Sequence, residues 1–211
     1  MMPLALALGL AIGYVSGSLA WGLWIPRAAR GIDVRTLGSG NLGATNVYRT
    51  LGPPLGITVL LLDVAKGAVP VWLVPALPVA AAFPGGAEWC RLAVGSAAVL
   101  GHVFTMFAGF KGGKGVATAG GVLLALAPLP CLVCLLVFVA TVASTRFISF
   151  GSMLAALAFP VTLALAPGGA RTPTFAFGVL LALLVVVRHK DNIRRLLRGE
   201  ERRFSLKGGS A

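Results

Sequence analysis

The segment from Gly101 to Thr118, GHVFTMFAGFKGGKGVAT, holds the densest group of residues suited to chemistry. Between two apolar stretches it places Lys111, Gly112, Gly113, Lys114 and Gly115. Glycine lets backbone N–H groups turn toward a ligand, and ammonium groups supply positive charge. The pattern therefore predicts an anion site at a membrane surface, with phosphate as the expected ligand. The alternative is a short basic loop whose charges only fix the membrane topology.

Two other polar clusters interrupt the apolar sequence. Residues 37–49, LGSGNLGATNVYR, supply Ser39, Gly40, Asn41, Thr45, Asn46 and Arg49. Asn41, Thr45 and Arg49 recur every four residues, which predicts that they share one helical face. Residues 188–203, RHKDNIRRLLRGEERR, contain His189 and Asn192 at a spacing of three. A basic tail beside a membrane accounts for the arginines of this segment but not for His189 and Asn192.

A smaller cluster comprises Ser144, Thr145 and Arg146 together with Ser149 and Ser152. Loops carrying these clusters are expected to converge on one side of a membrane. Such a site is rich in N–H, hydroxyl, amide and cationic donors, with Asp191 as the carboxylate near His189. These groups suit a dianionic, hydroxylated small molecule that meets a lipid-soluble partner.

Three apparent motifs do not carry the function they suggest. Residues 38–43 match GxGxxG, but no strand precedes them, as a dinucleotide site requires, and Asp63 falls within an apolar span. GFKGGKG lacks the spacing of a Walker A loop. Cys131 and Cys134 form CxxC inside an apolar run, where packing is expected rather than metal or redox chemistry. We therefore expect no metal and no cofactor.

Composition indicates an integral membrane protein. Of the 211 residues 57% are hydrophobic and 11% are charged, against about 25% charged in soluble domains. The mean hydropathy is +0.91. The net charge of +12 does not indicate a nucleic-acid partner, because the basic residues follow the expected membrane loops.

The apolar runs predict an all-α protein with seven transmembrane helices and an extracytoplasmic N-terminus. The expected spans are 2–25, 54–78, 89–108, 115–128, 130–144, 149–167 and 173–188. Without a turn at Pro128 and Pro130 the count falls to six. Seven spans place 15 of the 18 Lys and Arg residues on one side, which the positive-inside rule makes cytoplasmic, together with the C-terminus. Residues 2–25 lack a basic start and are expected to be a retained first helix.

Asp63, Lys66 and His102 are ionisable residues in the interior of the expected spans. Asp63 and Lys66 are three apart, so we expect them to pair on one face of the second span. His102 is expected to be a hydrogen-bonded packing group of the third span rather than a catalyst.

The chain resembles the bacterial acyl-phosphate-dependent glycerol-3-phosphate acyltransferases, the PlsY family. The resemblance rests on GSGNLGATNVYRTLG, GHVFTMFAGFKGGKGVAT and HKDNIRRLLRGEE, and extends to GIDVRTLGSGN and LLDVAKGAVPV. After Gly17-Ser18 this chain reads Leu-Ala-Trp-Gly, where family members often have Ile-Pro-x-Gly. The departure concerns the local shape of the first helix rather than the chemistry.

The resemblance implies a seven-helix enzyme of the bacterial cytoplasmic (inner) membrane, with its active site facing the cytoplasm. Such an enzyme transfers a fatty acyl group from acyl phosphate to the sn-1 hydroxyl of glycerol 3-phosphate. The products are lysophosphatidic acid and phosphate, in the first acylation of phospholipid synthesis. We expect a single acyltransferase domain over 1–211 with a basic tail from about 189 to 211, in contact with membrane lipid and monomeric.

The expected roles follow from this reaction. Phosphate and substrate binding are assigned to Ser39, Gly40, Asn41, Thr45, Asn46, Arg49, Lys111, Gly112, Gly113, Lys114 and Gly115, and catalysis to His189, Asn192, Ser149 and Lys114. Developing charge on the carbonyl oxygen needs preorganised donors, for which Asn192, His189 and loop N–H groups are candidates. The base is either His189 or an oxygen of the substrate phosphate, and we favour the substrate.

Two other classes of function compete with this one. An organophosphate or phosphate transporter explains the spans and the cations, but its site is expected near the bilayer midplane between repeats, and no repeat is visible. A protein that only binds anionic lipid headgroups explains the basic tail, and leaves the loops at 38–43 and 111–115 unexplained.

Overall fold

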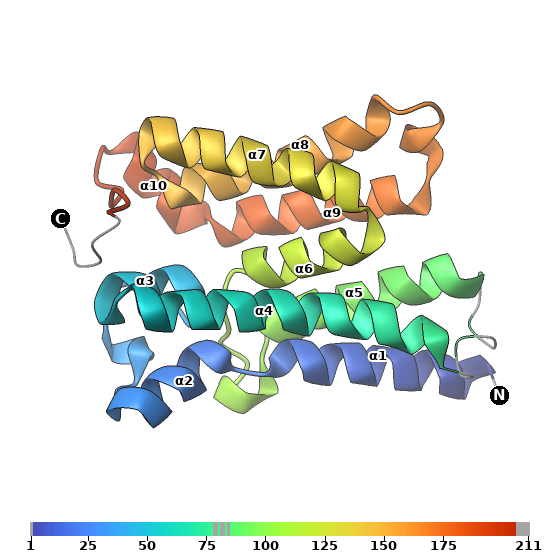
Figure 1. Cartoon of the computed structure of the whole chain (residues 1–211), viewed down its shortest axis with the longest axis horizontal. Helices are drawn as coiled ribbons and strands as arrows, with labels where there is room; N and C mark the ends of the chain where they lie inside the picture. The colour runs from blue at the N-terminus through green and yellow to red at the C-terminus, as the bar shows by residue number, and fades with distance from the viewer. Residues whose placement is uncertain (1, 78–79, 81–82, 84, 206–211) are drawn as a thin grey trace. The chain divides into compact units, whose positions relative to one another are not determined.

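The structure, a computed structural model, describes residues 2–77, 80, 83 and 85–205, and this part of the chain is all helical (Figure 1). Its α-helices are α1 (Met2–Ser18), α2 (Trp21–Arg30), α3 (Ala44–Leu51), α4 (Pro53–Leu73), α5 (Gly86–Val103), α6 (Val116–Leu126), α7 (Pro128–Thr145), α8 (Ile148–Ala164), α9 (Pro173–Arg188) and α10 (Lys190–Leu197). Short 3₁₀ turns are η1 (Val34–Thr36), η2 (Val74–Ala76), η4 (Met106–Ala108) and η5 (Gly169–Arg171). The end of the predicted tail, 206–211, and residue 78 of the predicted second span lie outside the described residues.

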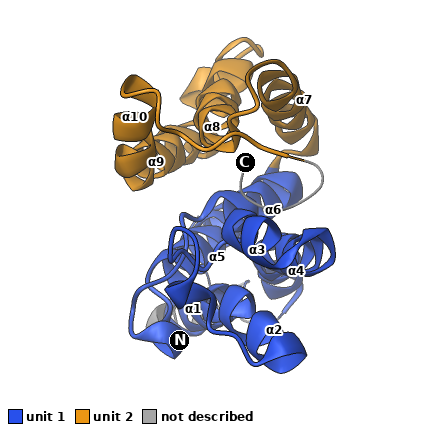
Figure 2. Cartoon of the chain, turned by 90° about the vertical axis from the view of Figure 1, so that its left-hand side faces the viewer, with its two compact units in different colours: residues 1–126, 207–209 blue, residues 127–206, 210–211 orange. Residues whose placement is uncertain are grey.

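The chain divides into two compact units (Figure 2). Unit 1 contains α1 to α6, where α1 packs against α4 and α5, and α6 packs against the same two helices. Unit 2 contains α7 to α10, where α8 contacts both α7 and α9, and α10 contacts α9. A single acyltransferase domain stays a prediction.

Local sequence signals explain where several helices begin. Pro53 follows Gly52, whose φ of 97° turns the chain into α4. Pro128 opens α7 directly after α6 ends, so the predicted break of the 115–144 run is confirmed. Thr172 caps α9 by accepting a hydrogen bond from the Phe175 amide at 3.1 Å, with Pro173 as the first helical residue.

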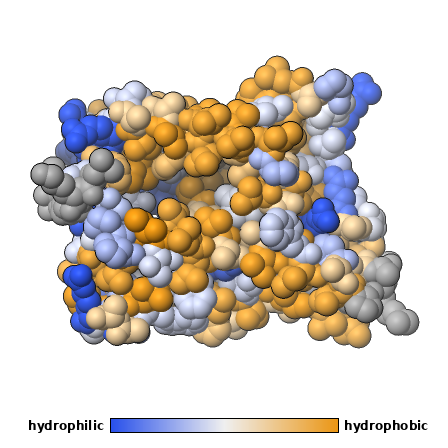
Figure 3. Space-filling model, viewed as in Figure 1, coloured by the Kyte–Doolittle hydropathy of each residue, from blue (hydrophilic) through white to orange (hydrophobic). Residues whose placement is uncertain are grey.

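The outer surfaces of both units are rich in apolar side chains, which cover most of the face shown in Figure 3. In the described residues, four stretches are long and apolar enough to cross a bilayer: Leu6–Arg30, Pro53–Ala76, Gly86–Ala108 and Pro128–Thr145. The pair of α9 and α10, bent by 58°, adds a fifth if it is counted as one span. Two predicted spans coincide with the shorter apolar helices α6 and α8, so seven crossings stay a prediction.

The first predicted span, 2–25, is not one continuous helix. The helix stops at Ser18 and resumes at Trp21. Buried side chains explain the break, because they donate hydrogen bonds to the carbonyl groups at this point. Thr105 Oγ1 donates to the Ser18 carbonyl, and Lys66 Nζ donates to the Leu19 carbonyl at 2.8 Å. The break forms without a proline, since residues 18–21 are Ser-Leu-Ala-Trp.

The strained backbone at Arg146 gives a first prediction. Arg146 ends α7 with φ 65°, the left-handed region that costs a non-glycine residue about 1–2 kcal/mol. Arg146→Gly is therefore expected to raise the melting temperature of the detergent-solubilised protein. Arg146→Ala is the control, because it removes the same charge but keeps the β-carbon that causes the strain. Equal melting temperatures for the two variants would contradict this explanation.

Candidate functional site

Asn46 organises the first polar loop of unit 1, residues 38–43. Its side chain is buried, accepts a hydrogen bond from the Ser39 amide at 3.0 Å, and donates to the carbonyls of Leu37 at 3.1 Å and Asn41 at 3.0 Å. Because both ends of this amide are engaged by the loop backbone, we assign Asn46 to shaping the loop. Ser39, by contrast, is exposed.

The predicted common face of Asn41, Thr45 and Arg49 is only partly formed. Thr45 and Arg49 lie one turn apart on α3, but α3 begins at Ala44, so placing Asn41 on the same helical face is wrong. Asn41 lies in the loop and accepts a hydrogen bond from the Gly43 amide at 2.8 Å. The physical reason is local, since an Asn side chain that bonds the backbone two residues on favours a turn over a helix.

The glycine-rich loop, residues 110–115, lies between η4 and α6. The Gly112 amide donates to the Val103 carbonyl at 3.0 Å, and the Gly113 amide donates to the His102 carbonyl at 3.2 Å. These two N–H groups are therefore directed at the end of α5, in contrast to the expected phosphate cradle. The glycines instead allow close approach, because a β-carbon at Gly112 would lie 1.9 Å from the His102 carbonyl oxygen.

The charges of this loop take different positions. Lys111 is exposed, Lys114 is half-buried, and Gly115 is buried with φ 87°. Lys114 directly precedes α6, and the first turn of a helix favours anions. The phosphate prediction for the loop therefore depends on Lys114 and the start of α6 more than on Gly112 and Gly113.

Unit 2 brings Ser149 and Asn192 together through a residue that the sequence reasoning missed. Ser149 Oγ on α8 and Asn192 Nδ2 on α10 both donate to Glu201 Oε1 at 2.6 Å. Arg195 Nε donates to Glu201 Oε2 at 2.8 Å. The Glu201 side chain is only 2% exposed, so it is a buried anchor for two helices. Its one sequence signal is the acidic pair Glu200-Glu201 inside a basic tail.

The three donors keep Glu201 ionised. Burial alone raises the pKa of this carboxyl, but the hydrogen bonds from Ser149, Asn192 and Arg195 outweigh burial, so the pKa lies below its ordinary value. Asp191, the carboxylate expected to accompany His189, instead forms an ion pair with Arg194 at 3.3 Å. Both partners of that pair are largely exposed, so it contributes little.

His189 lies at the bend between α9 and α10 and is 2% exposed. Its Nδ1 is 2.8 Å from the Val185 carbonyl oxygen. A carbonyl can only accept a hydrogen bond, so Nδ1 carries a proton, and in the neutral ring Nε2 carries the lone pair. The structure thus fixes the orientation and the tautomer of this imidazole.

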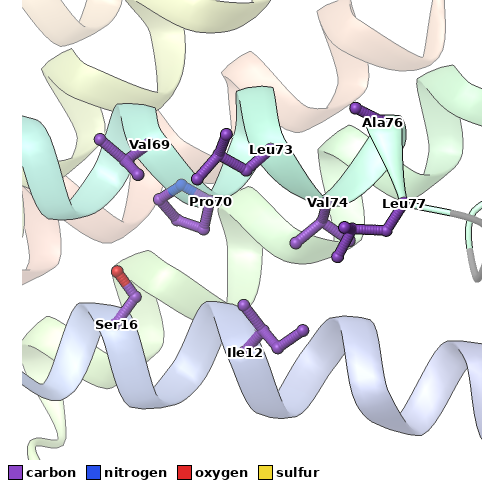
Figure 4. A pocket seen from close by; sticks show the side chains of 8 residues that line it. All are labelled: Ile12, Ser16, Val69, Pro70, Leu73, Val74, Ala76 and Leu77. Carbon is purple, nitrogen blue, oxygen red and sulfur yellow. The ribbon is translucent and has the colours of Figure 1, made fainter.

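An apolar groove marks the surface of unit 1 (Figure 4). It has a volume of about 360 Å³ and is lined by Ile12, Ser16, Val69, Pro70, Leu73, Val74, Ala76 and Leu77. The hydroxyl of Ser16 is already donated to the Lys66 carbonyl at 2.9 Å. The groove therefore suits a hydrocarbon chain and not a phosphorylated group.

The described part of the chain is all helical and has apolar outer surfaces, which defines an integral membrane protein, and cationic, hydroxyl, amide and imidazole groups lie in and beside its loops. The chain belongs to a family described as glycerol-3-phosphate acyltransferase, which matches residues 7–199. This match includes every predicted site residue.

Individual relatives match over nearly their whole length. A glycerol-3-phosphate acyltransferase of Geobacter sulfurreducens is 49% identical over 195 residues, covering 92% of this chain and 95% of the relative. One of Desulforudis audaxviator is 44% identical over 207 residues, covering 98% and 100%. The chain is also similar to the crystal structure of PlsY, an integral membrane glycerol 3-phosphate acyltransferase, in its glycerol 3-phosphate form. The TM-score is 0.82 at 36% identity, covering 95% of this chain and 96% of PlsY. A second PlsY structure, the lysophosphatidic acid form, matches with a TM-score of 0.80.

Proposed function

We propose that this protein transfers an acyl group from acyl phosphate to the sn-1 hydroxyl of glycerol 3-phosphate, which yields lysophosphatidic acid and phosphate. The observation that carries the proposal is the match to PlsY over 95% of this chain, since PlsY is known in a glycerol 3-phosphate form and a lysophosphatidic acid form. The cationic loops support it, because both substrates carry phosphate and both products are phosphate compounds.

In unit 1 we assign phosphate binding to Lys114 and Arg49, with Ser39 and Thr45 as neutral donors. The half-buried position of Lys114 before α6 supports this assignment, because partial removal from water strengthens its attraction for an anion. Lys111 is exposed and is assigned to long-range attraction of anions. Gly40 and Gly115, with φ of 68° and 87°, shape the two loops.

In unit 2 we assign the acyl-transfer chemistry to His189 and Asn192, and we assign Ser149, whose single O–H is donated to Glu201, to holding that carboxylate in place. The hydrogen bond to Glu201 Oε1 fixes the position of the Asn192 amide, and preorganised N–H donors stabilise the charge that develops on a carbonyl oxygen. The leaving group is phosphate, so the reaction needs no strong general acid.

We further propose that an oxygen of the substrate phosphate takes the hydroxyl proton, and that His189 orients the substrate. His189→Ala should then retain measurable turnover, with kcat lowered less than the roughly 10²–10⁴-fold expected for loss of a general base. Single-turnover kinetics on the purified variant measure this. Complete loss of turnover at an unchanged melting temperature would instead make His189 the base.

The same proposal includes the topology and the setting. We propose seven crossings, an extracytoplasmic N-terminus, a cytoplasmic C-terminus, a monomer, and the bacterial cytoplasmic membrane as the location. The distribution of charge supports this arrangement, since 15 of the 18 Lys and Arg residues would then lie on the cytoplasmic side. Cysteine-accessibility labelling at residues 30 and 171 tests the orientation, because the two positions should react from opposite sides.

The deciding experiment supplies the purified protein with labelled glycerol 3-phosphate and one of three donors: palmitoyl phosphate, palmitoyl-CoA or palmitoyl carrier protein. We expect lysophosphatidic acid with palmitoyl phosphate as the donor and none with either thioester. Product from the thioesters only would support glycerol 3-phosphate as the acceptor and contradict acyl phosphate as the donor. No product from any donor would contradict the enzyme, and uptake of labelled glycerol 3-phosphate into proteoliposomes would then favour the transporter.

A further inference from the structure

Unit 1 buries three ionisable side chains that the proposed reaction does not use: Asp63 and Lys66 on α4 and His102 on α5. They are 1%, 6% and 6% exposed. Asp63 Oδ1 is 2.7 Å from Lys66 Nζ, which confirms the predicted pair, and 3.7 Å from His102 Nδ1. Ionisable groups within an apolar span are costly to bury, so a retained cluster of three is expected to serve a purpose.

His102 supports the glycine-rich loop directly. Its carbonyl accepts the Gly113 amide, and the next carbonyl, that of Val103, accepts the Gly112 amide. The imidazole lies against the same loop, because a β-carbon placed at Gly113 would be 2.2 Å from Nε2. The ring is held in turn by Thr118 on α6, whose Oγ1 is 3.0 Å from His102 Nδ1. The imidazole is therefore packed against the backbone that precedes Lys114.

The cluster also reaches the first polar loop. Asp63, Lys66 and His102 line a small cavity of about 10 Å³ together with Leu42 of the loop 38–43 and Gly112 of the loop 110–115. Lys66 Nζ additionally holds the Leu19 carbonyl at the break between α1 and α2. The cluster thus packs against the loop 110–115 and shares a cavity with the loop 38–43, the two loops to which we assign phosphate binding.

We propose that Asp63, Lys66 and His102 are positioning residues for acyl transfer, which fix the glycine-rich loop, and with it Lys114, relative to the loop 38–43. The proposal rests on the proposed function, because it assigns the cluster to the geometry of that site. None of the three residues touches the reacting atoms in this proposal. They act through Gly112 and Gly113, whose amides join the loop to α5.

Thr118 allows a test that leaves every proposed substrate contact in place. It is fully buried, so Thr118→Val keeps the packing volume and removes the hydroxyl that holds His102, whereas Thr118→Ser keeps the hydroxyl and removes a methyl group. We expect Thr118→Val to raise the KM for one of the two phosphorylated substrates at least fivefold with kcat within twofold, and Thr118→Ser to stay within twofold of the wild type. If the serine variant is impaired as much as the valine variant, packing is the role and the proposal is overturned.

His102→Gln and His102→Ala provide a second pair. Glutamine can restore a hydrogen bond to Thr118, so it should recover most of the KM change that alanine causes. Val71→Ala is the stability control, because Val71 is fully buried on α4 and does not line the small cavity between the two loops. If Val71→Ala lowers the melting temperature as much as His102→Ala does and also raises the same KM, the positioning proposal is overturned.

The two proposals fail in different ways. If the wild type makes no lysophosphatidic acid from any donor, the proposed function and the positioning proposal are both overturned. If the wild type is active and Thr118→Val and His102→Ala show wild-type KM values for both substrates, the positioning proposal alone is overturned.

Discussion

Glu201→Ala is expected to destabilise the protein by about 3 kcal/mol and to remove most acyl-transfer activity. The substitution takes away the acceptor shared by Ser149, Asn192 and Arg195, and it leaves the first two as buried donors without their carboxylate. Asn192 then loses the contact that sets its side-chain orientation. The melting temperature in detergent and the rate of lysophosphatidic acid formation measure the two effects.

Glu200→Ala is the matched control, because Glu200 precedes Glu201 and is exposed. It removes the same charge from the same segment and is expected to change the melting temperature little. Glu201→Gln should fall between the two, since its amide keeps one oxygen acceptor but faces the existing donors with an NH₂ group. If Glu200→Ala and Glu201→Ala have equal effects, then Glu201 acts only through its charge and not through its hydrogen bonds.

The lowered pKa of Glu201 gives this prediction a pH dependence. A carboxylate whose folded pKa lies below its unfolded value, about 4.3, stabilises the fold fully above that value. The stabilisation is lost as the pH falls through the folded pKa. The difference in melting temperature between the wild type and Glu201→Gln should therefore be constant near neutral pH and shrink below about pH 4. A difference that grows on acidification would contradict the assigned ionisation.

Gly112→Ala is expected to lower kcat/KM about 100-fold or more. A β-carbon at Gly112 would lie 1.9 Å from the His102 carbonyl oxygen, which belongs to the backbone of α5 and cannot rotate aside. The loop must move instead, and a displacement of about 1 Å at a catalytic group costs roughly 100-fold in rate. Steady-state kinetics with acyl phosphate and glycerol 3-phosphate give the value.

Gly120→Ala on α6 is the control for Gly112→Ala. Outside the backbone of its own helix, no heavy atom lies within 4 Å of a β-carbon at Gly120, so alanine fits without displacement. Alanine is also favoured over glycine inside a helix by about 0.5–1 kcal/mol, so this variant should be active and at least as stable as the wild type. Wild-type kinetics for Gly112→Ala would show that the loop tolerates displacement.

The glycines at 112 and 113 illustrate what a sequence can and cannot predict. Two lysines and three glycines between apolar runs correctly predicted a loop between two helices, whereas its phosphate-binding role stays a prediction. The direction of the amides was not predictable, because it depends on carbonyls at 102 and 103 that only the fold brings close. Likewise, the spacing of Asp63 and Lys66 predicted their pairing, but not the approach of His102 from another helix.

Glu201 was missed for a related physical reason. Its partners lie 52 residues away at Ser149 and 9 residues away at Asn192, and no periodicity of a single element joins them. The break after Ser18 was also missed, since its causes, Lys66 and Thr105, belong to other helices. Apolar segments and their proline boundaries were predictable, because both depend on neighbouring residues alone.

The length of α6 has a consequence for the surrounding lipid. With 11 residues, α6 is roughly 16 Å long, about half the thickness of a hydrocarbon core. In the proposed seven-span topology α6 would be a crossing helix, and such hydrophobic mismatch would be relieved by local thinning of the bilayer, which lets water and headgroups descend toward a short helix. Lys114, at the start of α6, would then meet an amphiphilic donor at the depth of its own headgroup, so a fatty phosphate could react without being extracted from the leaflet.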